Sequence, residues 1–177
     1  EEKKWFDGLD FLRQIPQVNG EYFVNEALAN GKRVLAEGAQ GTMLDIDFGT
    51  YPFVTSSNTV TSGVCNGLGV APNRIGRVIG ITKAYCTRVG SGPFPTELHD
   101  EMGEKIRVAG GEFGATTGRP RRCGWIDIPQ LRFSNMINGV TEIVVTKTDV
   151  LSEFESIDLC VGYRINGTVT TELPYDL

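Results

Sequence analysis

The sequence predicts an α/β protein with a largely parallel sheet, flanking helices and a carboxyl-terminal β-hairpin. Apolar segments typical of strands alternate with helical patterns, and this alternation favours parallel pairing. Hydrophobic residues make up 40% of the 177 residues, an ordinary share for a globular domain with a core. Asn166-Gly167 lies between two strand-like segments and is a strong signal for a hairpin.

The amino-terminal part of the chain is predicted to form two helices and one strand before a long loop. Apolar residues recur at helical spacing over residues 1–15, and residues 21–30 form a second amphipathic pattern that a glycine ends. Residues 33–37 are predicted to be a short buried strand that leads into a glycine-rich loop at 38–42. Residues 45–73 are rich in Thr, Ser, Asn and Gly and are expected to be irregular; such long segments are usually functional loops.

The middle of the chain is predicted to alternate between helices and loops. Helices are expected over residues 74–86, 97–109 and 129–138, the last with Pro129 in its first turn and Gly139 at its end. Loops rich in glycine are expected at 90–95 and 112–124.

The last part of the chain is predicted to be mostly strands. Residues 141–146 form an apolar segment expected to be a buried strand, followed by Lys147-Thr148-Asp149. Residues 159–165 and 168–172 are the two arms of the predicted hairpin.

Composition excludes several functional classes. Lysine and arginine total 17, aspartate and glutamate total 22, and the net charge is −5, so neither a nucleic-acid coat nor a polybasic membrane binder is expected. No apolar run approaches the ~18 residues of a membrane span.

Isolated cysteines and a single histidine give no basis for a metal or hydrolase site. The four cysteines lack metal-site spacing and are expected to be reduced thiols of a cytosolic protein. His99 lies in a charged helical stretch and is expected on the surface. We predict no metal site and no Ser- or Cys-based hydrolase.

The first candidate site is the loop at residues 38–42. Its glycines allow backbone amides to approach a ligand at the carboxyl end of the predicted strand. Gln40 offers an amide donor and an amide acceptor, which suit the edge of a purine. A tight turn without a ligand remains the alternative.

The second candidate is the segment GATTGRPRR at residues 114–122. Two glycines, adjacent threonine hydroxyls and the arginines Arg119, Arg121 and Arg122 are typical of a flexible loop that binds anions. Planar guanidinium groups bind carboxylate or phosphate at two points, which lysine cannot do. A solvated basic loop or a protein contact is the alternative.

The third candidate is Lys147-Thr148-Asp149. A carboxylate at the end of a strand can accept both the ring N–H and the exocyclic amine of guanine, while a lysine stem covers the base. A capped turn is the alternative. No G-x-x-x-x-G-K-[ST] phosphate loop accompanies it.

Five longer strings make the chain similar to the adenylosuccinate synthetase family. They are EGAQGT at 37–42, DIDFGTYPFVTSSNT at 45–59, KAYCTRVGSGPFPTEL at 83–98, EFGATTGRPRRCGWID at 112–127 and TKTDVL at 146–151. The resemblance runs from about residue 33 to the end of the chain, over strings that are uncommon elsewhere.

This resemblance implies a GTP-dependent ligase of AMP synthesis with a P-loop-NTPase-like synthetase fold. In the family, GTP phosphorylates the 6-oxygen of IMP, and the amino group of L-aspartate then displaces the phosphate to give adenylosuccinate. The resemblance also implies Mg²⁺ as cofactor and a cytoplasmic homodimer, without nucleic-acid or membrane partners.

The resemblance further assigns binding roles to matching positions. The IMP site would comprise Gln40, Leu44, Thr55, Val89 and Arg119. The loop closing over L-aspartate would comprise Ala115, Thr116, Thr117, Gly118, Arg119, Pro120 and Arg121. GTP would be bound by Arg121, Lys147, Thr148 and Asp149.

The chain also lacks elements of the family. The G-D-E-G-K-G loop, with its general-base and Mg²⁺-binding Asp, is absent, and so is the general-acid His. We therefore expect residues 1–177 to be a single internal segment without catalytic residues or metal ligands, inactive alone. Residues 1–32 would be a variable helical region and residues 33–177 the substrate- and guanine-binding part. A free-standing GTP/GDP-binding module and an inert interaction domain are the alternatives.

Overall fold

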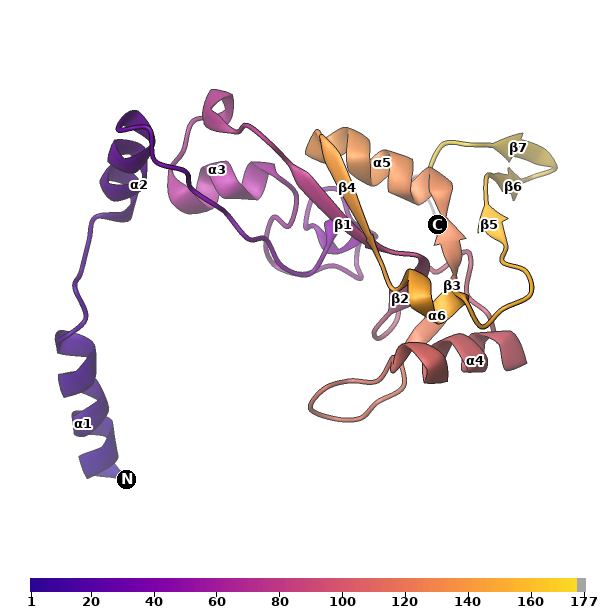
Figure 1. Cartoon of the computed structure of the whole chain (residues 1–177), viewed down its shortest axis with the longest axis horizontal. Helices are drawn as coiled ribbons and strands as arrows, with labels where there is room; N and C mark the ends of the chain where they lie inside the picture. The colour runs from indigo at the N-terminus through magenta and orange to yellow at the C-terminus, as the bar shows by residue number, and fades with distance from the viewer. Residues whose placement is uncertain (175–177) are drawn as a thin grey trace.

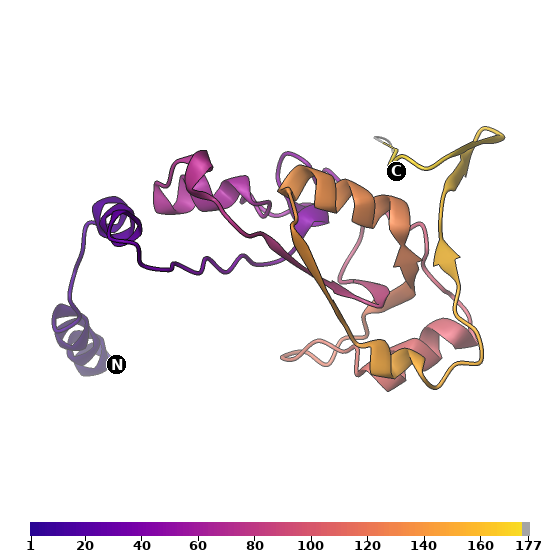
Figure 2. The same cartoon turned by 45° about the horizontal axis from the view of Figure 1, so that its top comes forward.

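The computed structural model describes residues 1–174 and begins with two helices, of which the first lies apart from the other elements and the second packs against α3 (Ser62–Leu68), where Nδ2 of Asn25 donates to the Gly69 carbonyl at 2.9 Å. Helices α1 (Glu2–Arg13) and α2 (Gly20–Ala29) confirm the first two predicted helices. In both views α1 lies at one end, away from the strands (Figure 1, Figure 2). None of the helices within residues 1–174 is long and apolar enough to cross a membrane.

The buried strand predicted at residues 33–37 is wrong. The segment carries no strand hydrogen bonds, and Leu35 is 89% exposed. An apolar run becomes a strand only when a neighbouring strand satisfies its backbone groups, and none within residues 1–174 does so.

Three short helical elements lie just before and within the long segment expected to be irregular, residues 45–73. They are η1 (Thr42–Leu44), α3 (Ser62–Leu68) and η2 (Pro72–Arg74). The remainder of residues 45–73 is irregular, as predicted, and α3 ends at Gly69 in the left-handed conformation.

The helix predicted over residues 74–86 is also wrong, because these residues form strands. Strand β1 (Ile79–Lys83) is followed by β2 (Tyr85–Arg88). The segment is rich in β-branched residues and contains two glycines, which favour an extended backbone over a helix.

Parallel pairs and antiparallel pairs both occur among the strands. Strand β1 pairs in parallel with β4 (Glu142–Thr146), from Ile79 opposite Glu142 to Lys83 opposite Thr146. Strand β3 (Arg122–Asp127) pairs antiparallel with β2 and parallel with β5 (Leu159–Cys160). The predicted hairpin is confirmed around Asn166-Gly167 as β6 (Tyr163–Ile165) and β7 (Thr168–Thr170), but its arms are shorter than predicted, because Leu159 and Cys160 pair with β3 and β7 ends at Thr170.

Three more helices flank these strands and confirm the predicted α/β class. They are α4 (Glu101–Gly110), α5 (Ile128–Asn138) and α6 (Thr148–Leu151). Helix α4 starts later than the predicted residue 97, because the Asp100 side chain accepts the backbone N–H groups of Met102 and Gly103. The loop predicted at 112–124 ends earlier, since β3 begins at residue 122.

The strand predicted at residues 141–146 is confirmed as β4, but it is not buried. Ile143, Val144 and Val145 are each about half exposed. A run of apolar residues predicts a strand whose side chains are covered. Within residues 1–174, however, the side chains of β4 have no covering layer.

The core lies where α4, α6, β2 and β3 meet. Its buried members are Tyr85, Ile106, Cys123 and Val150, and Trp125 packs against them. Because α4 is held on β3 by this core, the segment between them, residues 111–121, has two fixed ends. The chain leaves α4 through Gly110 and Gly111.

We predict that Gly110→Ala destabilises the fold by about 2 kcal/mol, because an overpacked core loses stability. A Cβ at this position would lie 2.3 Å from Oη of Tyr85. Urea unfolding measures the loss. Gly67→Ala is the matched control, since nothing lies within 4 Å of its added Cβ. Equal stability of the two variants would contradict the close approach seen here.

Candidate functional site

Gln40, Leu44 and Thr55 come together in one loop cluster. Nε2 of Gln40 donates to Oγ1 of Thr55 at 3.3 Å, and the backbone N–H of Thr55 donates to the Leu44 carbonyl at 2.8 Å. The Ser57 hydroxyl donates to Oε1 of Gln40 at 3.4 Å. Gln40 has a positive φ of 69° and is exposed, so its amide can meet a ligand.

Asp45 organises this loop cluster, although it is absent from the predicted site. Its buried carboxylate accepts backbone N–H groups from Asp47 and Phe48 on one oxygen and from Thr59 and Val60 on the other. Burial opposes ionisation, but these four bonds outweigh it and hold the pKa of Asp45 below its usual value. An aspartate within a Thr/Ser/Asn-rich loop was the available signal.

Val89 directly follows β2. It is exposed, and the preceding Arg88 donates from Nη2 to Thr50 Oγ1 and to the Phe53 carbonyl. Arg88 therefore ties the end of β2 to the loop that contains Thr55.

The predicted anion loop projects from the molecule between α4 and β3 (Figure 1, Figure 2). The six residues Ala115, Thr116, Thr117, Gly118, Arg119 and Pro120 are all exposed. The loop closes on itself through Gly118 N–H to the Gly114 carbonyl at 2.8 Å and Gly114 N–H to the Arg119 carbonyl at 2.9 Å. Its hydroxyls and the Arg119 guanidinium are thus open to an incoming anion.

The prediction that Arg122 is part of the anion-binding loop is wrong. Nε of Arg122 donates to Oε1 of Glu97 at 2.8 Å, Nη2 contacts Oε2, and Nη1 donates to the carbonyls of Gly90 and Gly92. The guanidinium is neutralised and holds the 90–92 turn, so it is a structural group.

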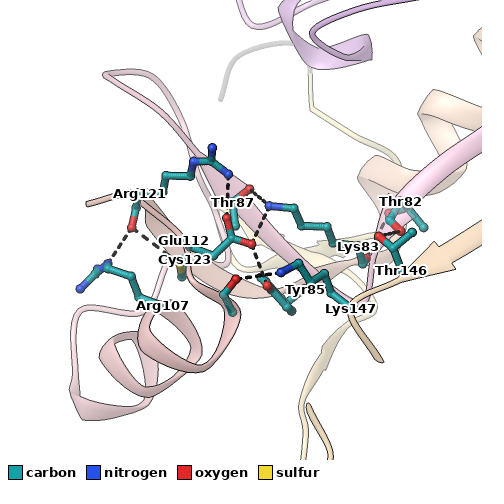
Figure 3. Close-up of polar contacts among 11 residues, drawn as sticks. Thr82, Lys83, Tyr85, Thr87, Arg107, Glu112, Arg121, Cys123, Thr146 and Lys147 are labelled. Atoms are coloured by element: carbon teal, nitrogen blue, oxygen red, sulfur yellow. Dashed lines mark hydrogen bonds and ion pairs between the residues drawn. The ribbon is translucent and has the colours of Figure 1, made fainter. Parts of the chain in front are cut away.

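A buried carboxylate, Glu112, lies at the base of the loop (Figure 3). Its side chain is 2% exposed. Oε1 accepts from Lys83 Nζ and from Tyr85 Oη, each at 2.7 Å, and Oε2 accepts from Arg121 Nη1 at 2.8 Å.

The environment of Glu112 keeps its carboxyl group ionised. Burial opposes ionisation, but hydrogen bonds from Lys83, Tyr85 and Arg121 outweigh it and lower the pKa of Glu112. Burial and the neighbouring carboxylate together raise the pKa of the Tyr85 hydroxyl, so it remains a donor. Sequence reasoning missed Glu112; its place directly before a glycine- and arginine-rich loop was the only signal.

Lys147, Thr148 and Asp149 follow β4 at the start of α6. Lys147 adopts a left-handed conformation with φ 61°, and its Nζ donates to the Gly110 carbonyl at 2.8 Å. Thr148 and Asp149 are exposed. Gly110 contacts Tyr85 and lies two residues before Glu112. The segment Lys147–Asp149 and the anion loop are therefore both held by residues 110–112.

The predicted residues therefore form two groups. Gln40, Leu44 and Thr55 are joined by hydrogen bonds, while Arg121 and Lys147 are both anchored to the 110–112 corner. No hydrogen bond within residues 1–174 joins the anion loop to Gln40 or Thr55. A bound ligand would have to bridge them.

The described residues contain no obvious reaction centre of their own. Among residues 1–174, no three His, Cys, Asp or Glu side chains gather so as to hold a metal ion. His99 is 81% exposed, which confirms its predicted surface position. The four cysteines are free thiols.

Strands that end in exposed polar loops characterise α/β proteins that bind ligands at the carboxyl edge of a sheet. The model of the adenylosuccinate synthetase family matches residues 4–177, and the chain belongs to that family.

The chain is similar to proteins named adenylosuccinate synthetase over almost its whole length. It is 59% identical to the protein of Phocaeicola vulgatus and 61% identical to that of Bacteroides thetaiotaomicron, each over 99% of this chain. It spans only 42% of the length of these curated relatives. A solved structure of fully ligated adenylosuccinate synthetase from Plasmodium falciparum superposes with a TM-score of 0.83 at 49% identity, covering 90% of this chain and 38% of that one. This likeness confirms the expected synthetase fold.

We predict that Glu112→Gln lowers the free energy of unfolding by about 3 kcal/mol at pH 7, because it leaves the charges of Lys83 and Arg121 without their buried carboxylate partner. The folded-state pKa of Glu112 lies below its usual value of 4.5. Its stabilisation is thus complete above that value and is lost as the pH falls through the folded-state pKa. The difference in the free energy of unfolding between wild type and Glu112→Gln should therefore become smaller as the pH is lowered from 7 to 3. Urea unfolding at each pH measures it.

The control for this prediction is Glu142→Gln. Glu142 makes an exposed two-point ion pair with Arg77, and such surface pairs contribute little. A gap between wild type and Glu112→Gln that stays constant with pH would show that the carboxylate is not the source of the stabilisation.

Proposed function

We propose that the chain is the substrate- and guanine-binding part of a GTP-dependent ligase that joins IMP and L-aspartate. In this reaction the γ-phosphoryl group of GTP passes to the 6-oxygen of IMP. The aspartate amino group then attacks carbon 6 and expels phosphate, so that adenylosuccinate, GDP and phosphate leave. Membership of the adenylosuccinate synthetase family supports this proposal.

The observation that carries the proposal is the joining of Gln40, Leu44 and Thr55 in one exposed loop cluster. These residues are 4 to 15 positions apart, and the fold brings them together with an amide and a hydroxyl available. In the proposal Gln40 contacts the IMP base near its reacting edge and Thr55 binds the 5′-phosphate. Leu44 and Val89 are proposed to line the nucleotide site.

The anion loop is proposed to close over L-aspartate. Ala115, Thr116, Thr117, Gly118 and Pro120 supply backbone and hydroxyl groups, and Arg119 also reaches the IMP ribose. Arg121 is shared between aspartate and GTP. Exposure of the loop and its glycine-closed base support this role.

Mg²⁺ enters the proposal as the cofactor of the complete enzyme, where it would neutralise charge on the transferring phosphoryl group. The described residues hold no cluster suited to it, so its ligands and the catalytic acid and base are proposed to lie outside this segment. The complete enzyme is proposed to be a cytoplasmic homodimer.

The 177-residue chain alone is predicted to form no adenylosuccinate from GTP, IMP and aspartate, because it lacks the acid, the base and the phosphate loop. The complete protein should form it, and a spectrophotometric assay compares the two. Calorimetric titration of the chain with GDP and IMP tests the rival function. Binding below micromolar dissociation constants would favour a free-standing nucleotide-binding module.

Asp149 is predicted to select guanine. In the complete protein, GTP should have a KM about ten-fold lower than ITP, whose base lacks the 2-amino group that Asp149 would accept. Asp149→Ala should raise the KM for GTP and abolish this difference. Asp158→Ala is the control, because Asp158 is an exposed aspartate in the segment between α6 and β5. This variant should preserve the preference for GTP over ITP. An unchanged preference in Asp149→Ala would remove Asp149 from the guanine site.

A further inference from the structure

We propose that Glu112 is a positioning residue that holds the Arg121 guanidinium by one nitrogen and leaves its other edge for an anionic group of the ligand. The ligand group is a carboxylate or phosphate. This inference rests on the proposed function, in which Arg121 contacts aspartate and GTP.

The two oxygens of Glu112 have separate duties. Oε1 receives both Lys83 Nζ and Tyr85 Oη, whereas Oε2 receives only Nη1 of Arg121 (Figure 3). The carboxylate is therefore fixed by two donors from β1 and β2, and its second oxygen is dedicated to Arg121. Lys83 and Tyr85 are on strands, so the anchor belongs to the folded body and not to the exposed loop.

The free edge of Arg121 is the one that other arginines of this chain use for carboxylates. Arg77 and Arg122 both bind a carboxylate through Nε and Nη2 together. In Arg121 the single guanidinium hydrogen bond within residues 1–174 comes from Nη1. Its Nε is buried without a partner among the described residues. A buried donor without an acceptor is costly, and a ligand oxygen would satisfy it.

The backbone of Arg121 is fixed as firmly as its side chain. Its N–H donates to the Glu112 carbonyl at 3.0 Å, and its carbonyl accepts from Arg107 Nε at 2.8 Å. Arg121 is thus set at the base of the loop, while residues 115–120 are exposed. Because Nε has almost no exposed surface, a ligand oxygen reaches it only when neighbouring atoms shift.

The test compares four variants in the complete protein, assayed for adenylosuccinate formation. Glu112→Gln and the double variant Lys83→Met/Glu112→Gln both remove the carboxylate from Arg121. The double variant also removes the charge of Lys83, which would otherwise lack a partner, so it should be more stable than Glu112→Gln alone. Lys83→Met and Tyr85→Phe are the controls, because each leaves the Arg121 contact in place.

We expect both variants that lack the carboxylate to raise the KM for aspartate and for GTP at least ten-fold, with the KM for IMP within two-fold. The controls should lower the thermal midpoint yet keep all three KM values within two-fold. If the double variant regains stability and also regains the wild-type KM for aspartate, or if the controls raise it equally, Glu112 is only structural and the inference is overturned.

Wild-type activity separates the inference from the function on which it rests. An active wild type with unchanged KM values in Glu112→Gln overturns the positioning role alone. A wild type that forms no adenylosuccinate overturns the proposed function, and this inference with it.

Discussion

The ion pairs and hydrogen bonds of Glu112 are the interaction on which the rest of the candidate site depends. A carboxylate placed in the core would be destabilising alone, and here three donors from β1, β2 and the loop end keep it ionised. The same corner of the chain supplies the Gly110 carbonyl that holds Lys147. One buried charge therefore fixes the base of the anion loop beside the segment proposed to bind guanine.

Local signals in the sequence were sufficient for the features whose physics is local. The turn at Asn166-Gly167, the helix between Asp127 and Gly139 and the exposed position of His99 follow from neighbouring residues alone. Residues 33–37 and 74–86 were mispredicted because strand formation depends on a partner far away in the chain. Ile79 faces Glu142 across 63 positions, and no window of adjacent residues contains that information.

The residues of the candidate site also differ in how far the sequence predicts them. Its exposed members, such as Gln40 and Arg119, belong to uncommon strings that the sequence displays directly. Its supports, Asp45 and Glu112, are single acidic residues whose importance lies in which donors surround them after folding. Arg122 shows the converse, since an arginine of the predicted loop is neutralised by Glu97 from 25 positions away. Composition cannot distinguish a free guanidinium from a paired one.

The separate position of α1 has a practical consequence for spectroscopy. The chain contains two tryptophans, of which Trp5 lies exposed on α1 and Trp125 packs edge-on against Phe154 at the core. Their fluorescence therefore reports on different parts of the molecule. Replacing Trp5 with phenylalanine would leave Trp125 in β3 as the one tryptophan, so that tryptophan quenching and the tryptophan emission maximum follow the core without a contribution from α1.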